Sequence, residues 1–329
     1  MLVRDALTTR DLFLCVADFQ DGSFKDLMPF RHVKKPPHSA YMHKLPTALT
    51  HLHQLLVPWL ATYGTARLDK LFGYMPHMRD LIILHSVVFG DVPTLTYLLE
   101  RFLKEIHGFS DPLLDVAAAY GQLAVLQILH AVEYPGCTRN AIDWAAFHGH
   151  LPVILFLHAH RKEGATTKAM DAAAMNGHRE VVKFLHMHRT EGCTTDAMTE
   201  AAWNGHLDVV IFLHTHRSEG CSIWTMDRAA WSGRLAVVRF LHEVRSEKCT
   251  AQAMDMAAWN GHLDVLEYLH GIGAPCTANA LQYAAMNGHL EIIKFLVSCR
   301  REGNFSMAIA AAEQRSQSAV VQYLKAHAK

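Results

Sequence analysis

Residues 197–222 read AMTEAAWNGHLDVVIFLHTHRSEGCS, and the stretches 169–195 and 253–277 repeat this pattern with few changes. Each copy has a marker glycine in its middle, and successive marker glycines lie 28 residues apart, except for a last step of 27. The marker glycines are Gly121, Gly149, Gly177, Gly205, Gly233, Gly261 and Gly288. Such a period predicts small units that cannot bury their apolar faces alone and therefore stack into one continuous core.

Each unit is predicted to contain two helices. In the copy around Gly205, Thr194 or Thr195 can cap a first helix that runs to about Trp203. The dipeptide Asn-Gly then breaks the chain, because both residues tolerate a positive φ angle. The second helix is expected to begin near Leu207, where apolar residues recur with helical spacing. No segment shows the alternation of a useful β-strand.

The sequence also indicates where the second helices begin and end. Pro152 lies three residues after the marker glycine Gly149, and Pro93 lies three residues after Gly90, the corresponding glycine of a weaker flanking copy. Proline is tolerated in the first turn of a helix but not in its middle. At the other end, Arg217 suits the negative pole of the helix dipole, and Gly220 is expected to stop the helix. The 19 residues from Ala201 to Gly220 leave room for a second helix that is longer by about one turn.

The string AAWNGHLDVVIFL, residues 201–213, is similar to the two joined helices of ankyrin repeats, which have the pattern AAxxGHxxVVxxLL. The resemblance covers roughly residues 77–329 and implies an all-α, ankyrin-like helix-turn-helix solenoid of about eight or nine units. Met307–Lys329 lacks the marker glycine and is expected to form a C-terminal cap. Ankyrin repeats have a period of about 33 residues, whereas the period here is 28. The β-hairpin fingers of ankyrin repeats are therefore expected to be shortened to tight loops.

Residues 1–75 lie outside the clear repeat, and we assign the repeat array to residues 76–329. Two stretches of the N-terminal part, residues 2–22 and 49–64, look helical, which favours an N-terminal helical cap on the first repeat. The alternative is a small adaptor module that recruits other machinery. The segment from Leu45 to Trp59 has a faint similarity to the opening of an F-box, which is the basis of this alternative.

A column of large side chains follows the alanine pair of successive units: Phe147, Met175, Trp203, Trp231, Trp259 and Met286. Polar residues come directly after most of them, namely Asn176, Asn204, Ser232, Asn260 and Asn287. The ankyrin resemblance implies that the large residues face the concave groove, where repeated aromatics are typical binding anchors. We therefore expect the large residues and the asparagines to bind a partner protein. The alternative is that the tryptophan rings only fill the space between repeats.

A second column contains Cys193, Cys221, Cys249 and Cys276. Neighbouring units are roughly 8–10 Å apart, as packed helices are. This distance is too long for a disulfide and does not let four ligands meet around one zinc ion. We therefore expect buried, free cysteines that act as small apolar residues.

Histidines form two more columns. The first contains His130, His158, His186, His214, His242 and His270, and the second, directly after the marker glycines, contains His150, His178, His206, His262 and His289. The first column is expected to consist of half-buried imidazoles bonded to a backbone group of the next repeat. A pH-sensitive stack and a metal site are the alternatives for that column. The second column is assigned to hydrogen bonds in the turns.

The composition limits the function classes. The 329 residues carry 31 basic and 31 acidic side chains, so the formal charge is zero, which argues against nucleic acid or a membrane as the partner. The sequence has no GxSxG, HExxH or Walker motif, and a column of similar residues does not supply the different groups that catalysis needs. We expect a monomeric, non-catalytic protein-protein interaction scaffold without cofactor or metal. Seven cysteines without a CxxC pair favour a cytoplasmic or nuclear location.

Overall fold

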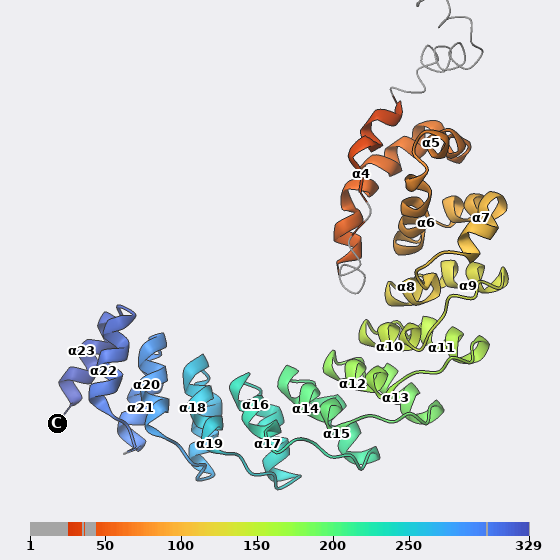
Figure 1. The fold of residues 1–329 in the computed structure, drawn as a ribbon. Helices are drawn as coiled ribbons and strands as arrows, with labels where there is room; N and C mark the ends of the chain where they lie inside the picture. Colours follow the sequence, from red (N-terminus) through yellow and green to blue (C-terminus); the bar gives the residue numbers. More distant parts are fainter. Residues whose placement is uncertain (1–25, 35, 37–43, 301, 329) are drawn as a thin grey trace, which may run out of the picture. The chain divides into compact units, whose positions relative to one another are not determined.

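The structure, a computed structural model, describes residues 26–34, 36, 44–300 and 302–328. The described residues form two compact units. The first unit runs to Ala145 and also includes Pro152–Gly164, and the second consists of Ala146–Leu151 and the residues from Ala165 onward. Within the described ranges all regular elements are helices, which confirms the all-α prediction (Figure 1).

The elements up to Gly164 are mostly pairs of short helices joined by turns. They are η1 Met28–His32, α4 Leu45–Tyr63, η3 Thr65–Arg67, α5 Leu68–Tyr74, α6 His77–Phe89, α7 Val92–His107, α8 Leu113–Ala119, α9 Leu123–Ala131, α10 Asn140–Phe147 and α11 Leu151–His160. The helix expected over residues 49–64 is confirmed as α4, which begins four residues earlier. The helix expected over residues 2–22 lies outside the described residues. The domain boundary near residue 75 stays a prediction.

The second unit is a series of helix pairs. They are α12 Thr167–Met175 with α13 Arg179–His188, α14 Thr195–Asn204 with α15 Leu207–His216, α16 Thr225–Trp231 with α17 Leu235–Glu243, α18 Ala251–Asn260 with α19 Leu263–Gly271, α20 Ala278–Asn287 with α21 Leu290–Cys299, and α22 Phe305–Gln314 with α23 Ser318–His327. Within this unit the first helices of the pairs pack side by side in one row, and the second helices form another (Figure 1). From α12 to α21, the first helices lie on the concave side of the unit.

The boundaries of the first helices follow the predicted caps. The Thr194 side chain accepts a hydrogen bond from the backbone N–H of Asp196 at 3.1 Å, and α14 begins at the next residue. Gly205 ends α14 with a φ angle of 86°, in the left-handed region that glycine tolerates. The second helix begins at Leu207, as expected. The alanine pair Ala201 and Ala202 is fully buried, which allows close approach of neighbouring helices.

The predicted end of the second helix is wrong. Helix α15 stops at His216, and Arg217 already has an extended backbone with φ −128° and ψ 150°. Gly220 lies three residues after Arg217, in the loop, so the loop and not an extra helical turn takes up the spacing. The guanidinium of Arg217 pairs with the carboxylate of Glu219, with Nε donating to Oε2 at 3.2 Å. This local ion pair holds the loop in a compact form.

The same Arg-x-Glu pair recurs after the second helix of other repeats. The pairs are Arg161–Glu163, Arg189–Glu191, Arg217–Glu219, Arg245–Glu247 and Arg300–Glu302. Glu191 also reaches the preceding loop, because its Oε1 accepts a hydrogen bond from the backbone N–H of Ala165 at 3.0 Å. The tight loops that were predicted in place of fingers are therefore held by ion pairs and connected to their neighbours.

Hydrogen bonds between an aspartate and a threonine of the next repeat join successive first helices. Asp171, in the middle of α12, accepts hydrogen bonds from the backbone N–H of Thr194 at 2.8 Å and from its hydroxyl at 2.9 Å. Equivalent bridges join Asp115 to Thr138, Asp227 to Thr250 and Asp255 to Thr277. Burial raises the pKa of Asp171, although the hydrogen bonds from Thr194 favour its carboxylate form. The bridge fixes the cap of one repeat to the helix of the repeat before it.

We expect Gly177→Ala to lower the free energy of unfolding by about 2 kcal/mol. Gly177 has a φ angle of 73°, and a Cβ atom there would lie 2.5 Å from Nδ1 of His206 in the next repeat. The substitution therefore adds a steric conflict to the backbone strain. Urea denaturation of the purified protein measures the effect.

Gly220→Ala is the matched control, because Gly220 has a similar φ angle of 76° but nothing within 4 Å of the added Cβ. It should cost only the backbone strain, about 1 kcal/mol. The double variant Gly177→Ala/His206→Ala should recover part of the loss. Equal losses for Gly177→Ala and Gly220→Ala would show that the contact with His206 is unimportant.

Candidate functional site

The predicted binding column occupies equivalent positions in the structure. Each member is the last residue of a first helix or the residue before the last: Phe147, Met175, Trp203, Trp231, Trp259 and Met286. All six belong to the second unit. Trp231 is 42% exposed, whereas the other five are half-buried. A large apolar ring that remains accessible to water at the end of α16 is the most distinctive feature of this column.

The aromatic rings form two clusters and not a uniform ladder. In the first cluster the rings of Trp203 and Trp231 have centroids 5.0 Å apart and are tilted by 60°. The guanidinium carbon of Arg228 lies 4.2 Å from the centre of the Trp203 ring, a cation–π contact. In the second cluster Trp259 meets Tyr283 edge to face, with centroids 4.9 Å apart. Ring contacts therefore join neighbouring repeats in pairs.

Two further aromatic residues belong to the same face. Trp224, directly before α16, is 46% exposed and lies seven residues before Trp231, on the same side of the helix axis. Tyr283 lies three residues before Met286 in α20. We define the aromatic face as Trp203, Trp224, Arg228, Trp231, Trp259 and Tyr283. Sequence reasoning missed Trp224, Arg228 and Tyr283, although their helical spacing from the column was a usable signal.

The charges on the aromatic face neutralise each other. Arg228 donates from Nη1 to Oε1 of Glu200 at 2.6 Å. This ion pair bridges α14 and α16, and it holds Arg228 in place against Trp203. The centre of the face is therefore aromatic and carries no net charge.

The asparagine side chains are engaged within the repeats. Nδ2 of Asn204 donates to the carbonyl of Met175 at 3.0 Å, and Nδ2 of Asn260 donates to the carbonyl of Trp231 at 2.9 Å. The other members behave similarly: Asn287 donates to Trp259, Ser232 to Trp203, and Asn176 to Ala172 in its own helix. These bonds satisfy carbonyls at the ends of the first helices. That the asparagines bind a partner stays a prediction. Because their Nδ2 atoms already donate within the repeats, such contacts would be made by the Oδ1 atoms.

Two of the histidines after the marker glycines form the predicted hydrogen bonds in the turns. Nε2 of His178 donates to the carbonyl of Phe147 at 3.1 Å, and Nε2 of His289 donates to that of Trp259 at 3.0 Å. Gln122, which stands at the same position in the first unit, donates to the carbonyl of Val88 at 3.0 Å. This column therefore has a structural role in joining repeats.

The other histidine column differs from its prediction. Five of its six members, all except His158, pack edge-on against an aromatic ring of the following second helix and not against a backbone group: His130–Phe156, His186–Phe212, His214–Phe240, His242–Tyr268 and His270–Phe295. His186 and Phe212, for example, have ring centroids 5.6 Å apart. Burial lowers the pKa of His186. The partner is a ring because an aromatic residue recurs 25 or 26 positions after each of these histidines, a regularity visible in the sequence.

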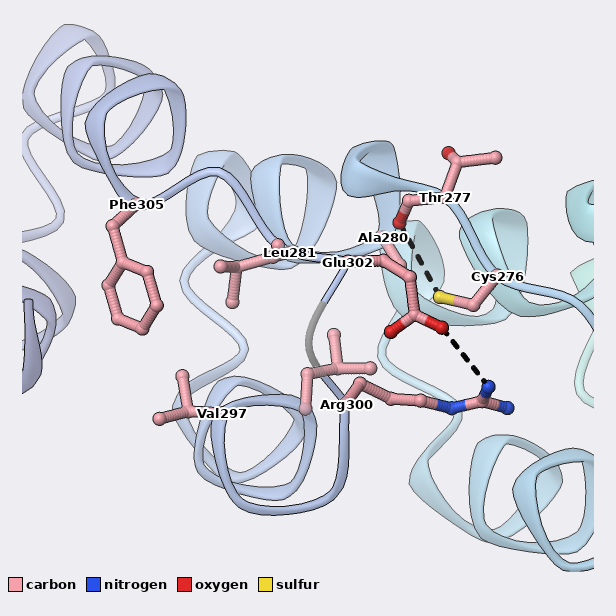
Figure 2. Close-up of a pocket in the computed structure, with 10 residues that line it drawn as sticks. Cys276, Thr277, Ala280, Leu281, Val297, Arg300, Glu302 and Phe305 are labelled. Atoms are coloured by element: carbon pink, nitrogen blue, oxygen red, sulfur yellow. Dashed lines mark hydrogen bonds and ion pairs between the residues drawn. The ribbon is translucent and has the colours of Figure 1, made fainter.

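The six cysteines that the structure describes are free. Of the column, Cys193 is buried as expected, whereas Cys221, Cys249 and Cys276 are only half-buried. Burial raises the pKa of Cys193 to about 11 and that of Cys276 to about 12. Cys276 borders a hollow of about 50 Å³, and Figure 2 shows it beside the ion pair of Arg300 and Glu302. This space admits a few water molecules at most. The hollow is therefore too small for an organic ligand.

We expect slow reaction of the column cysteines with a thiol reagent in the native protein at mildly alkaline pH. The thiolate is the reactive form, and burial keeps Cys193 and Cys276 protonated by raising their pKa to about 11 and about 12. Among the six cysteines that the structure describes, exposed Cys299 should react first. Titration after unfolding without a reductant should find all seven thiols, and a count of three or fewer would contradict the absence of disulfides.

No group of three or more histidine, cysteine, aspartate or glutamate side chains among the described residues is arranged to hold a metal ion. None of the described helices is both long and apolar enough to cross a membrane.

Comparison with protein families gives matches over the repeats. A family model described as ankyrin repeats (3 copies) matches residues 142–227 and 254–329, and one described as ankyrin repeats (many copies) matches residues 226–270. Comparison with curated proteins gives no match. The family matches together extend over more than half of the chain, and they include all six residues of the predicted binding column. The chain therefore belongs to the ankyrin-repeat family.

Proposed function

We propose that the protein is a non-catalytic scaffold that binds a partner protein on the aromatic face of its second unit. Ankyrin repeats are in general protein-protein interaction modules. The observation that carries the proposal is the exposure of Trp231 next to the ring of Trp203, together with the exposure of Trp224 one helix length before it on the same side of α16. Removing such rings from water is favourable, and the free chain does not complete their burial.

The chemistry of the aromatic face suits the centre of an interface. Tryptophan, tyrosine and arginine are the residues most enriched among those that dominate binding energy. Interface centres are also poor in unpaired charges, and Arg228 is already paired with Glu200. The arginine needs no rearrangement to present its stacked side chain, because Trp203 and Glu200 hold it in position. The face is therefore preorganised, which lowers the cost of binding.

The expected partner is a protein with a matching uncharged, apolar surface. Phe147, Met175 and Met286 extend the same column at both ends, so a long partner segment could engage them as well. The predictions of a monomer, of a cytoplasmic or nuclear location, and of a function without cofactor, nucleic acid or membrane accompany this proposal.

The experiment uses the full chain as bait in three forms. These are the unchanged protein, the variant Trp231→Ala/Trp259→Ala, and the control Ile211→Ala, which removes an exposed apolar residue from the second helix α15. Mass spectrometry identifies proteins retained by the unchanged protein and the control but lost with the double variant. Each candidate is then purified and titrated directly against the three forms. A partner that binds all three equally would place the interface elsewhere.

The adaptor alternative requires a second partner bound through residues 1–75. It predicts that two proteins are retained together and that only one of them is lost from the Trp231→Ala/Trp259→Ala variant. A single partner that depends on the aromatic face would favour the plain scaffold.

A further inference from the structure

The first unit contains an open hollow of about 430 Å³ between α4, the turn that follows it and the start of α7. Its volume lies in the range of roughly 300–1,000 Å³ that is typical of small-molecule sites. Val57, Leu60 and Ala61 of α4 form one wall, and Phe89 of α6 and Pro93 of α7 contribute to the others. Because these side chains are all apolar, an apolar body fits this space.

One carboxylate supplies the charge of the hollow. Asp91 is the only ionisable acid among the lining residues, and neither lysine nor arginine is among them. Oδ1 of Asp91 accepts a hydrogen bond from the backbone N–H of Thr94 at 3.1 Å, as the cap of α7. Its Oδ2 atom has no hydrogen-bond partner among the described residues. A negative charge with a free acceptor therefore faces a mostly apolar space.

The start of α7 does not offset this charge. A helix N-terminus attracts anions through free backbone N–H groups. The N–H of Val92 is bonded to the carbonyl of Gly90 at 2.9 Å, Pro93 has no N–H, and that of Thr94 is bonded to Asp91. No donor of the first turn is left for an anionic ligand.

Two histidines complete the lining. Nδ1 of His53 and Nε2 of His85 are 3.0 Å apart and share a hydrogen bond, and the ring of Phe89 packs against both imidazoles. His85 is fully buried. Burial, followed by the effect of nearby His53, lowers the pKa of His85 to about 4, so this ring is uncharged at neutral pH. It adds a polar but neutral boundary, and it does not repel a cation.

We propose that this hollow binds a primary ammonium group carried on a small apolar body. The ammonium donates to the free carboxylate oxygen of Asp91, and the apolar body lies against Leu60, Ala61 and Phe89. Anions are disfavoured, because the hollow carries the carboxylate of Asp91 and its lining includes neither lysine nor arginine. The ammonium could come from a free small amine or from the N-terminus of a peptide with an apolar first residue.

Calorimetric or NMR titration of the full chain with phenethylamine tests the ligand class. Phenethyl alcohol has the same apolar body without charge, and hydrocinnamate carries a negative charge instead. We expect phenethylamine to bind at least tenfold more tightly than phenethyl alcohol, and hydrocinnamate to bind more weakly than either. Equal affinity for the amine and the alcohol, tighter binding of hydrocinnamate, or no binding of the amine would overturn the proposal.

Three variants locate the site. Asp91→Asn keeps a helix-capping side chain, and it should reduce the affinity for phenethylamine to that for phenethyl alcohol without changing the latter. Ala61→Phe places a ring in the hollow from an exposed position of α4, and it should weaken the binding of both compounds. Glu100→Gln removes an exposed charge of α7 outside the hollow and should change neither. Binding that survives both Asp91→Asn and Ala61→Phe would place the amine elsewhere and overturn the proposal.

The tripeptide Phe-Gly-Gly, with and without N-acetylation, distinguishes the two sources of the ammonium. Tighter binding of the free tripeptide than of phenethylamine, lost on acetylation, would identify a peptide N-terminus. Binding of phenethylamine that is tighter than that of the free tripeptide would identify a small amine. Both results support the ammonium site, whereas tighter binding of the acetylated peptide would contradict it.

Discussion

Acidification from neutral pH to about pH 4 is expected to lower the free energy of unfolding of the first unit by roughly 3 kcal/mol through His85. Burial lowers the pKa of this side chain from 6.5 to about 4 in the folded protein. Below pH 6.5 the unfolded chain therefore binds a proton that the folded chain does not. Above pH 6.5 the free energy of unfolding of the first unit does not depend on the protonation of His85. It decreases progressively as the pH falls from 6.5 towards 4.

Hydrogen exchange of the amides in α6, followed by mass spectrometry at several pH values, measures this loss locally. The variant His85→Gln carries no titratable group and should show a smaller decrease of protection with acid, after correction for the intrinsic exchange rate. His51→Gln, at an exposed position of α4, is the control and should behave like the unchanged protein. A pH dependence that is the same in His85→Gln and the unchanged protein would show that His85 does not cause it.

The repeated helices could be predicted from the sequence because each boundary has a local cause. Thr194 caps α14 through its own side chain, and Gly205 ends it through its own backbone angle. Such causes involve neighbours along the chain, so the pattern of residue types is enough to identify them. The predicted membership of the ankyrin-repeat family is confirmed, and ankyrin repeats are in general protein-protein interaction modules.

The end of the second helix was predicted wrongly because the sequence offers two competing signals. Glycine at position 220 is typical of a helix C-terminus, but α15 already ends at His216. Arg217 has an extended backbone and forms an ion pair with Glu219. The recurring Arg-x-Glu motif was visible in the sequence, yet its effect depends on a side-chain geometry that residue types do not reveal. The bridge from Asp171 to Thr194 was missed for a related reason, because it joins residues 23 positions apart.

The candidate site was predicted in position but not in arrangement. The column of Trp203, Trp231 and Trp259 follows from the period alone. Its division into two clusters depends on neighbours outside the column, since Arg228 occupies one face of Trp203 and Tyr283 contacts Trp259. A repeat period specifies which residues share a column, whereas ring orientation depends on the particular side chains between them.

We expect Trp231→Ala to weaken partner binding by more than about 2 kcal/mol, or roughly 30-fold, while costing only about 1 kcal/mol of stability. Trp231 is 42% exposed in the free protein, so truncation removes few internal contacts. A fully buried tryptophan would instead cost roughly 3–5 kcal/mol. Trp203→Ala should cost more stability than Trp231→Ala, because Trp203 contacts both Arg228 and Trp231.

Urea denaturation measures the stability of each variant, and titration with the partner found by capture measures the affinity. Ile211→Ala removes a similarly exposed apolar side chain, 41% accessible, from the second helix α15, and it should change neither quantity by much. The comparison separates the two roles of the tryptophan, because a ring that only fills space between repeats loses stability on truncation and leaves the affinity of the folded protein intact. A stability loss near that of a buried tryptophan, combined with unchanged partner affinity, would make Trp231 a packing residue and would remove the aromatic face from the interface.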